Sequence, residues 1–281
     1  MNHDETPPIF YINLDRAPER RAFMESQFKN LGLKNATRFA ALDVKNPATL
    51  RDANYKPGGW RARWSLTPTE IAVFESHRAL WTHIVTENLE MAIIMEDDVF
   101  ISKTLVISLA DLAKPTCDFD VIRLDGCKGN YPFGPENKVG STLVRPILQT
   151  VSSLGCYLLS RSGAEHLTRQ SAVYCDHADD FVLTPKKHWK LLQSWPAIAL
   201  QGANSKNDDP AITDILDSER TSVESEIAAP DKGPPLYRIS KELRRVSVRM
   251  ARKIFKDRVL LKQGGHIGYP PLAGDLPPYR E

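Results

Sequence analysis

The stretch that decides the fold is AIIMEDDVF, residues 92–100, in which three acidic residues follow directly on an apolar run. Residues 91–95 are typical of a buried strand, so Glu96, Asp97 and Asp98 come at its carboxyl end. Neighbouring like charges repel one another, and an unpaired charge near a core is costly to desolvate. We therefore expect a positive partner there, either a metal ion or an arginine. The alternative is an exposed loop whose charges are simply solvated.

Predicted strands and helices alternate on both sides of this stretch. The predicted strands are 8–14, 37–42, 119–124, 150–159 and 191–200, the last interrupted by Pro196; the predicted helices are 18–31, 67–88 and 161–169, and 45–66 is a predicted loop. Thr67, Pro68 and Glu70 form a strong helix start: a cap, a first-turn proline and a glutamate three residues after the cap. The alternation predicts an α/β domain with a mostly parallel central sheet, whose ligands bind beyond the carboxyl ends of the strands.

Composition and the N-terminal sequence exclude several classes of protein. The 281 residues are 42% hydrophobic and 26% charged, which is ordinary for a soluble globular protein. No apolar run approaches the roughly 18 residues that a membrane span needs, and the N-terminus MNHDETPP lacks a signal-peptide pattern. The four cysteines have neither C-x-x-C nor zinc spacing, which favours reduced thiols. We expect a cytoplasmic protein.

Charge is unevenly distributed towards the C-terminus. Residues 203–235 hold eight acids against three basic residues, whereas residues 238–262 hold ten Lys or Arg against two acids. We predict a globular domain at 1–205, an acidic linker at 206–236, and a basic helix followed by an irregular tail at 237–281. The basic segment suits the head groups of anionic lipids. Nucleic acid is the competing polyanion, and a helix with solvated outward charges is the simplest alternative; we favour peripheral membrane contact and no nucleic acid.

Four blocks of the chain, in order, resemble glycosyltransferase family 25, the lipopolysaccharide-type sugar transferases related to collagen galactosyltransferases. The blocks are INLDR with PERR at 12–21, LTPTEIAVFESHRALW at 66–81, IMEDDV at 94–99 and GCYLLSRSGA at 155–164, with Asp176 shortly after. The resemblance implies a GT-A-type nucleotide-binding domain and inverting transfer of a sugar from a nucleotide donor, usually a UDP-sugar, to a hydroxyl. The chain departs from the family pattern at Asp125, where a small residue is expected, and at Tyr174-Cys175, where Pro-Val is commoner.

The acidic triplet has the chemistry of a divalent-cation site. Alternate side chains of an extended segment share a face, so Glu96 and Asp98 are the predicted ligands of Mn²⁺ or Mg²⁺. Such ions often take only one or two carboxylates from the protein and complete their shell with substrate phosphates. Asp97 then points elsewhere or binds a sugar hydroxyl. A cation would also offset the charge that grows on a departing diphosphate.

Further residues are predicted to contact the donor. Asn13, at the end of the first strand, can hydrogen-bond a base or ribose, and Arg16 and Arg20 can meet phosphate. For the two arginines, a surface pair around a helix start is the alternative. His77 faces inward with the apolar stripe of its helix, so it is either a satisfied core histidine or, by family analogy, a donor-site residue. Tyr157 is predicted to belong to the core.

The acceptor hydroxyl needs a base to remove its proton. Asp176 is the predicted catalytic base, with Asp179 and Asp180 as rivals and His177 as the group that orients it. The alternative for this segment is a solvated helix start, since acids favour a first turn electrostatically.

The resemblance to family 25, together with the acidic triplet, implies a metal-dependent, inverting glycosyltransferase. It would move a hexose, galactose or glucose, from a UDP-sugar to a glycolipid or oligosaccharide acceptor such as a lipopolysaccharide core, at the cytoplasmic face of the membrane. The alternative is a non-catalytic GT-A-like protein that binds a membrane or a partner. A nucleotidyl or phosphoryl transferase is disfavoured because the sequence has neither G-x-x-x-x-G-K nor G-x-G-x-x-G.

Overall fold

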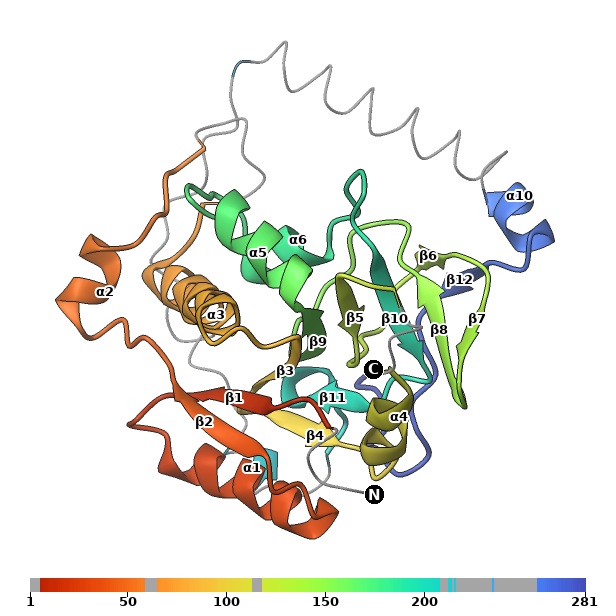
Figure 1. Cartoon of the computed structure of the whole chain (residues 1–281), viewed down its shortest axis with the longest axis horizontal. Helices are drawn as coiled ribbons and strands as arrows, with labels where there is room; N and C mark the ends of the chain where they lie inside the picture. Colours follow the sequence, from red (N-terminus) through yellow and green to blue (C-terminus); the bar gives the residue numbers. More distant parts are fainter. Residues whose placement is uncertain are drawn as a thin grey trace.

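An eight-stranded mixed sheet forms the centre of the molecule (Figure 1). The computed structural model describes residues 6–58, 65–112, 118–207, 212–213, 215, 234 and 257–281. The strand order is β2-β1-β3-β9-β5-β10-β8-β7. In chain order these strands are β1 (Ile9–Asn13), β2 (Ala36–Ala40), β3 (Met91–Glu96), β5 (Val121–Arg123), β7 (Asn137–Val139), β8 (Thr142–Pro146), β9 (Cys156–Ser160) and β10 (Leu191–Trp195).

Most strands of this sheet point in one direction. β1 pairs in parallel with β2 and β3, and β5 pairs in parallel with β10. β9 runs against its neighbours β3 and β5, and β8 runs against β10 and β7. Six of the eight strands therefore share a direction, which agrees with the predicted mostly parallel sheet. The two reversed strands make four of the seven pairings antiparallel, which the alternation of predicted elements did not reveal.

Helices cover both faces of the sheet (Figure 1). On one face lie α1 (Pro18–Leu31) and α4 (Leu105–Leu112); on the other lie α3 (Pro68–Thr86), α5 (Arg161–Gln170) and α6 (Ala178–Leu183). Strand β1 shows why both faces are apolar: Ile9 and Tyr11 pack into the core on the α1 side, while Phe10 and Ile12 pack into the core on the α3 side. Alternating side chains of a strand point to opposite faces, so a strand buried on both sides is apolar throughout.

Helix α3 begins where its sequence predicts. The Thr67 hydroxyl accepts from the Glu70 N–H, and the Glu70 carboxylate accepts from the Thr67 N–H, which is a complete capping box. Phe74 and Trp81 are fully buried against the sheet. This packing directs His77, on the same side of the helix, towards the carboxyl end of β3.

Several predicted segments differ from the structure. Of the strand predicted at 150–159, only the part from Cys156 is a strand, namely β9. The predicted loop 45–66 contains the short helix α2 (Pro47–Arg51), whose first turn is capped by the Asn46 side chain. The predicted strand 191–200 is two strands, because β10 ends at Trp195 and the chain turns at Pro196 into β11 (Ala199–Gln201). Strand β11 pairs antiparallel with β4 (Val99–Ile101), which follows directly on the acidic triplet. This pairing brings the end of β11 beside the acids.

The C-terminal residues return to the domain. Helix α10 (Asp257–Lys262) leads to β12 (His266–Gly268), which pairs with β6 (Tyr131–Phe133). Further on, the Asp275 carboxylate accepts from the Ser102 hydroxyl, and the Arg280 N–H donates to the carbonyl of Asn204, the last residue of η3 (Gly202–Asn204). The final residues are therefore packed against the wall that carries β11.

Most of the predicted acidic linker and basic segment lies outside the described residues, which include only 257–262 of the stretch 238–262. The predicted domain boundaries and the basic extension remain predictions. Among the described residues, no helix has both the length and the apolar character needed to cross a membrane.

Candidate active site

A cavity of about 800 Å³ opens at the carboxyl ends of β1 and β3. It is walled by the start of α1, the inner side of α3, the loop before β9, the start of α6 and the end of β11. Its lining includes Arg16, Arg20, Glu70, His77, Glu96, Asp97, Asp98, Ser153, His177, Asp179, Gln201 and Asn204. This is the edge at which open α/β sheets bind ligands, and it holds the acidic triplet.

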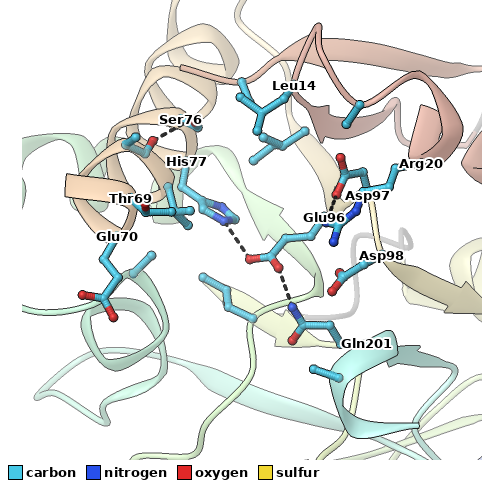
Figure 2. Close-up of a pocket in the computed structure, with 18 of the residues that line it drawn as sticks. Leu14, Arg20, Thr69, Glu70, Ser76, His77, Glu96, Asp97, Asp98 and Gln201 are labelled. Atoms are coloured by element: carbon cyan, nitrogen blue, oxygen red, sulfur yellow. Dashed lines mark hydrogen bonds and ion pairs between the residues drawn. The ribbon is translucent and has the colours of Figure 1, made fainter. Parts of the chain in front are cut away.

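Glu96 lies at the centre of the cavity, between α3 and β11 (Figure 2). Its Oε2 accepts a 2.6 Å hydrogen bond from Nε2 of Gln201. Its Oε1 lies 3.5 Å from Nε2 of His77. The carboxylate is therefore flanked by one polar side chain from each wall.

Asp97 is partnered inside the protein. Its two oxygens accept from Nη1 of Arg20 at 3.1 Å and from Nδ2 of Asn13 at 2.8 Å. Burial raises the pKa of Asp97 and the Arg20 charge opposes that rise. For this acid the expected positive partner is an arginine. A contact between Asp97 and a sugar hydroxyl remains a prediction, although both oxygens already accept a hydrogen bond.

Asp98 is buried without an ion pair of this kind among the described residues, although the charge of Arg20 lowers its pKa in part. Its side chain is 5% exposed, and within the described part of the chain its Oδ1 has no hydrogen-bond partner. Burial, and then the neighbouring charge of Glu96, raises the pKa of Asp98 to about 8. A buried carboxylate beside a second carboxylate favours a cation between them.

The donor set at Asp98 and Glu96 fits a hard divalent cation that keeps open positions. Among the described residues, no group of three or more His, Cys, Asp or Glu side chains is arranged to hold a metal ion. Mg²⁺ and Mn²⁺ prefer oxygen ligands, and Mg²⁺ is commonly held by only one or two carboxylates together with substrate phosphates. Such an ion is favoured here because, among the described residues, the Oδ1 of the buried Asp98 has no hydrogen-bond partner.

The predicted donor-contact residues occupy different positions. Arg16 and Arg20 line the cavity, and Arg16 pairs with Asp43 at 2.8 Å. Asn13 is buried: its amide donates to the Ala17 carbonyl and to Asp97, and its Oδ1 accepts from Arg38. Asn13 thus supports Asp97 from behind the cavity. Its predicted contact with a base or ribose is not tested by this arrangement, in which the side chain is 1% exposed.

His77 is a core histidine that also faces the cavity. It is 1% exposed, and its Nδ1 lies 3.0 Å from the hydroxyl of Tyr157. That hydroxyl accepts from Nε1 of Trp81 at 2.9 Å. Tyr157 is fully buried, as predicted.

The three candidate base residues lie around the start of α6. Asp179 lines the cavity, whereas Asp176 and Asp180 do not. The charge of Asp176 acts instead on Lys186, where it opposes the lowering of the Lys186 pKa by burial. Beside Asp179, His177 also lines the cavity, with its Nδ1 3.4 Å from Oε1 of Glu70.

Comparison with known proteins decides the family. The model of glycosyltransferase family 25, described as an LPS biosynthesis protein, matches residues 6–183. The chain belongs to glycosyltransferase family 25. A glycosyltransferase 25 family member from Aedes aegypti is 30% identical over 236 residues, covering 75% of this chain and 38% of that protein. One from Drosophila melanogaster is 32% identical over 202 residues, covering 69% and 26%. The chain thus spans well under half the length of these relatives.

One solved structure is also similar to this family 25 chain. It is described as mannose-1-phosphate geranyltransferase from Thermus thermophilus, and it aligns with a TM-score of 0.32 and 10% identity over 70% of this chain and 74% of that one.

The departure at Asp125 has a structural role in this family 25 domain. Asp125 is fully buried; Arg123 Nε lies 3.0 Å from its Oδ1, and its Oδ2 accepts from the Ser153 hydroxyl at 2.5 Å and the Gly155 N–H at 3.0 Å. Burial raises the pKa of Asp125 to about 6, and the Arg123 charge opposes the rise. Asp125 therefore supports the loop that carries Ser153, whose φ is +73° and which lines the cavity.

Sequence reasoning missed three polar groups of the family 25 cavity. Glu70 is recognisable only as a helix cap, yet its second oxygen faces His177. Gln201 and Asn204 lie after residue 183, where the family match ends, and no motif marks them. One feature of the sequence could have indicated Gln201: it directly follows a predicted strand, and ligands of an α/β sheet bind beyond the carboxyl ends of its strands.

Proposed function

We propose that this chain is a metal-dependent, inverting glycosyltransferase with a GT-A-type domain, using a UDP-hexose donor. The observation that carries the proposal is the buried Asp98, whose Oδ1 has no hydrogen-bond partner among the described residues, beside Glu96 in the cavity of a family 25 chain. Two carboxylates at one place are unfavourable alone, whereas with a divalent cation and a diphosphate they form a balanced cluster.

Asp98 and Glu96 would hold Mn²⁺ or Mg²⁺, which when bound supplies positive charge to the departing diphosphate. Arg16 and Arg20 lie on the same cavity wall and would add charge-assisted hydrogen bonds to phosphate oxygens. The pairing of Arg20 with Asp97 fixes the direction of the guanidinium before the donor arrives. Preorganised charge of this kind costs no rearrangement during the reaction.

For the catalytic base we propose Asp179 in preference to Asp176, because Asp179 lines the cavity and the charge of Asp176 acts on Lys186. The acceptor oxygen attacks the anomeric carbon while its proton passes to the Asp179 carboxylate. The new carbon–oxygen bond forms as the bond to the diphosphate breaks, and UDP leaves with the bonding electrons. A single displacement of this kind inverts the anomeric configuration.

The proposed acceptor is a hydroxyl of a glycolipid or oligosaccharide, and the proposed sugar is galactose or glucose. We also propose a cytoplasmic protein that contacts anionic membranes through the basic segment 238–262. The test replaces the Lys and Arg residues of 238–256 with Gln and leaves the packed C-terminal residues in place. Binding to vesicles that contain anionic lipid should fall, with binding to neutral vesicles as the control. Equal binding by the variant and the wild type would remove the membrane contact from the proposal.

The transferase proposal is tested by thermal stability and by turnover. Unfolding should be followed with UDP alone, Mn²⁺ alone and the two together. A rise of a few degrees that requires both is expected at ligand concentrations well above Kd. Hydrolysis of a panel of nucleotide sugars with Mn²⁺ then identifies the donor. No stabilisation by any nucleotide, with no hydrolysis, would favour the non-catalytic binding protein instead.

A further inference from the structure

Three buried side chains from two elements form a chain of polar contacts that ends at Glu96. Trp81 and His77 belong to α3, and Tyr157 belongs to β9. The Tyr157 hydroxyl lies between Nε1 of Trp81, at 2.9 Å, and Nδ1 of His77, at 3.0 Å. The other ring nitrogen of His77 faces Oε1 of Glu96 at 3.5 Å, as Figure 2 shows.

The protons along this chain can be assigned by counting donors. The indole nitrogen of Trp81 is a donor only, so the Tyr157 hydroxyl accepts there. The hydroxyl keeps its own proton, because burial raises the pKa of Tyr157 well above its ordinary value. His77 Nδ1 is the remaining partner of that hydroxyl within the described residues. If Nδ1 carried a proton, the Tyr157 hydroxyl proton would be buried without an acceptor, which is unfavourable because the hydroxyl has lost its contact with water.

The favoured arrangement therefore leaves Nδ1 as the acceptor and places the proton of neutral His77 on Nε2. That N–H points at Oε1 of Glu96, so the contact is attractive. The opposite tautomer would face the carboxylate with a lone pair. At 3.5 Å the contact is longer than an ordinary hydrogen bond, and Nε2 has no other partner among the described residues. Polar contacts of active sites often tighten only when the substrate is bound.

Glu96 is then held by donors from both walls. Gln201 donates through Nε2 to Oε2 of Glu96 at 2.6 Å, and this contact sets the direction of the amide, because the opposite orientation would face the carboxylate with the amide oxygen. With one donor at each oxygen, the plane of the carboxylate is set where it lines the cavity beside Asp98. Outer partners of this kind orient the ligands of metal sites.

We propose that Tyr157 is a positioning residue, which fixes His77 as an Nε2–H donor and thereby orients the Glu96 carboxylate. The expected effect of Tyr157 on catalysis rests on the proposed function. The assignment of the His77 tautomer does not depend on that function. The inference also explains why a tyrosine at the centre of the sheet has its hydroxyl between a tryptophan and a histidine, where phenylalanine would fill almost the same space.

The test is a long-range ¹H–¹⁵N NMR spectrum of protein labelled with ¹⁵N-histidine, at a pH where the imidazole is neutral. The His77 signal among the seven histidines is assigned by its absence from a His77→Gln variant. Wild-type protein should show Nε2 protonated and Nδ1 unprotonated. Tyr157→Phe should lose that preference, with a drop of about 10- to 100-fold in kcat or in Mn²⁺ affinity measured with UDP present.

Tyr11→Phe is the matched control. Tyr11 is similarly buried, and its hydroxyl donates to Glu25 at 2.9 Å on the other face of the sheet. This variant should lose a tyrosine hydroxyl while the His77 tautomer and kcat stay unchanged. A wild-type His77 protonated on Nδ1, or a Tyr157→Phe variant that matches Tyr11→Phe in spectrum and kinetics, would overturn the inference. If the wild-type protein transfers no sugar, the proposed function fails and the spectra still decide the tautomer.

Discussion

Two strands of the sheet are followed by buried carboxylates in opposite surroundings. Asp125, two residues after β5, is fully buried, and its Oδ2 accepts from the Ser153 hydroxyl and the Gly155 N–H. Its Oδ1 has no hydrogen-bond partner among the described residues, but it forms an ion pair with Arg123, whose Nε lies 3.0 Å away. Asp98, two residues after β3, is 5% exposed and has an oxygen with no hydrogen-bond partner in the described part of the chain. Burial raises the pKa of both carboxyls. At Asp98 the next largest influence is the negative charge of Glu96, which raises the pKa further, whereas at Asp125 it is the positive charge of Arg123, which lowers the pKa.

The difference shows which property of an acid points to a ligand. A buried carboxylate at a strand end is by itself compatible with an internal support, as at Asp125. A buried carboxylate that has no ion pair among the described residues, as at Asp98, favours a further counter-charge from a ligand, because the charge of Arg20 offsets only part of the rise in its pKa. Asp176 and Asp179 differ in another way, because the charge of Asp176 acts on Lys186 whereas Asp179 lines the cavity.

The largest effect is expected at Asp98. Asp98→Asn removes a charge from the proposed cation site, so the rate of sugar transfer should fall by about 10²–10³-fold, as when a charge-stabilising group is lost elsewhere. The rise in melting temperature that requires Mn²⁺ and UDP should disappear. Asp125→Asn is the control, and it should keep that rise. An equal loss of this rise in melting temperature in both variants would contradict the difference proposed between Asp98 and Asp125.

A smaller loss is expected at the base. Asp179→Asn should reduce kcat by about 10²-fold while donor binding is kept, because general-base catalysis commonly contributes 10²–10⁴-fold. Asp176→Asn should change kcat less than about threefold. The measurement is steady-state transfer with a saturating donor. The reverse ranking would restore Asp176, the base predicted from the sequence.

Asp125 should make the free energy of unfolding depend on pH. Its pKa is about 6 in the folded protein against an ordinary value of 3.8. Between those values the folded state holds the proton that the unfolded state has lost, so rising pH favours unfolding. Relative to Asp125→Asn, the wild type should lose about 2–3 kcal/mol of unfolding free energy from about pH 4 to about pH 6, then level off. Urea denaturation at a series of pH values measures this, and parallel curves for the two proteins would contradict it.

The smallest effect is expected at Ser153. Ser153→Ala removes the hydroxyl that donates to Asp125 and should cost about 1–2 kcal/mol of unfolding free energy. That hydrogen bond lowers the pKa of Asp125, so the pH step described above should move upward in the variant. Ser162→Ala, an exposed serine whose hydroxyl lies 3.3 Å from Asp120, is the control and should be nearly neutral. An unchanged step would show that the hydroxyl does not stabilise the carboxylate.

The sequence was sufficient for the parts of the fold that depend on local chemistry. The capping box at Thr67 and Glu70 fixed the start of α3, and the apolar run before Glu96 fixed β3. The reversed direction of β9 could not be predicted, because a strand buried on both faces has the same pattern in either direction. The strand predicted at 191–200 was expected to be interrupted at Pro196, but the sequence did not show that its two parts belong to different sheets.

Of the site, the acidic triplet and the two arginines were predictable because charged residues follow a strand or begin a helix. The different contacts that these residues make could not be predicted. Whether an acid forms an ion pair with an arginine depends on the direction of its side chain after the turn that follows β3. Asp97 is directed towards Arg20 and pairs with it, whereas the Oδ1 of Asp98 has no hydrogen-bond partner among the described residues. Gln201 depends on a contact between segments 105 positions apart. A neutral amide has no pattern in the sequence that would indicate such a partner.

The packing of the last residues against the domain has a practical consequence for the production of this protein. The Arg280 N–H donates to Asn204, and the Asp275 carboxylate holds Ser102, so the carboxyl terminus is joined to the wall that presents Gln201. An affinity tag or fluorescent fusion placed after Glu281 would begin one residue from that contact. Purification handles therefore belong at the amino terminus, and an inactive preparation tagged at the opposite end should be remade before its activity is judged.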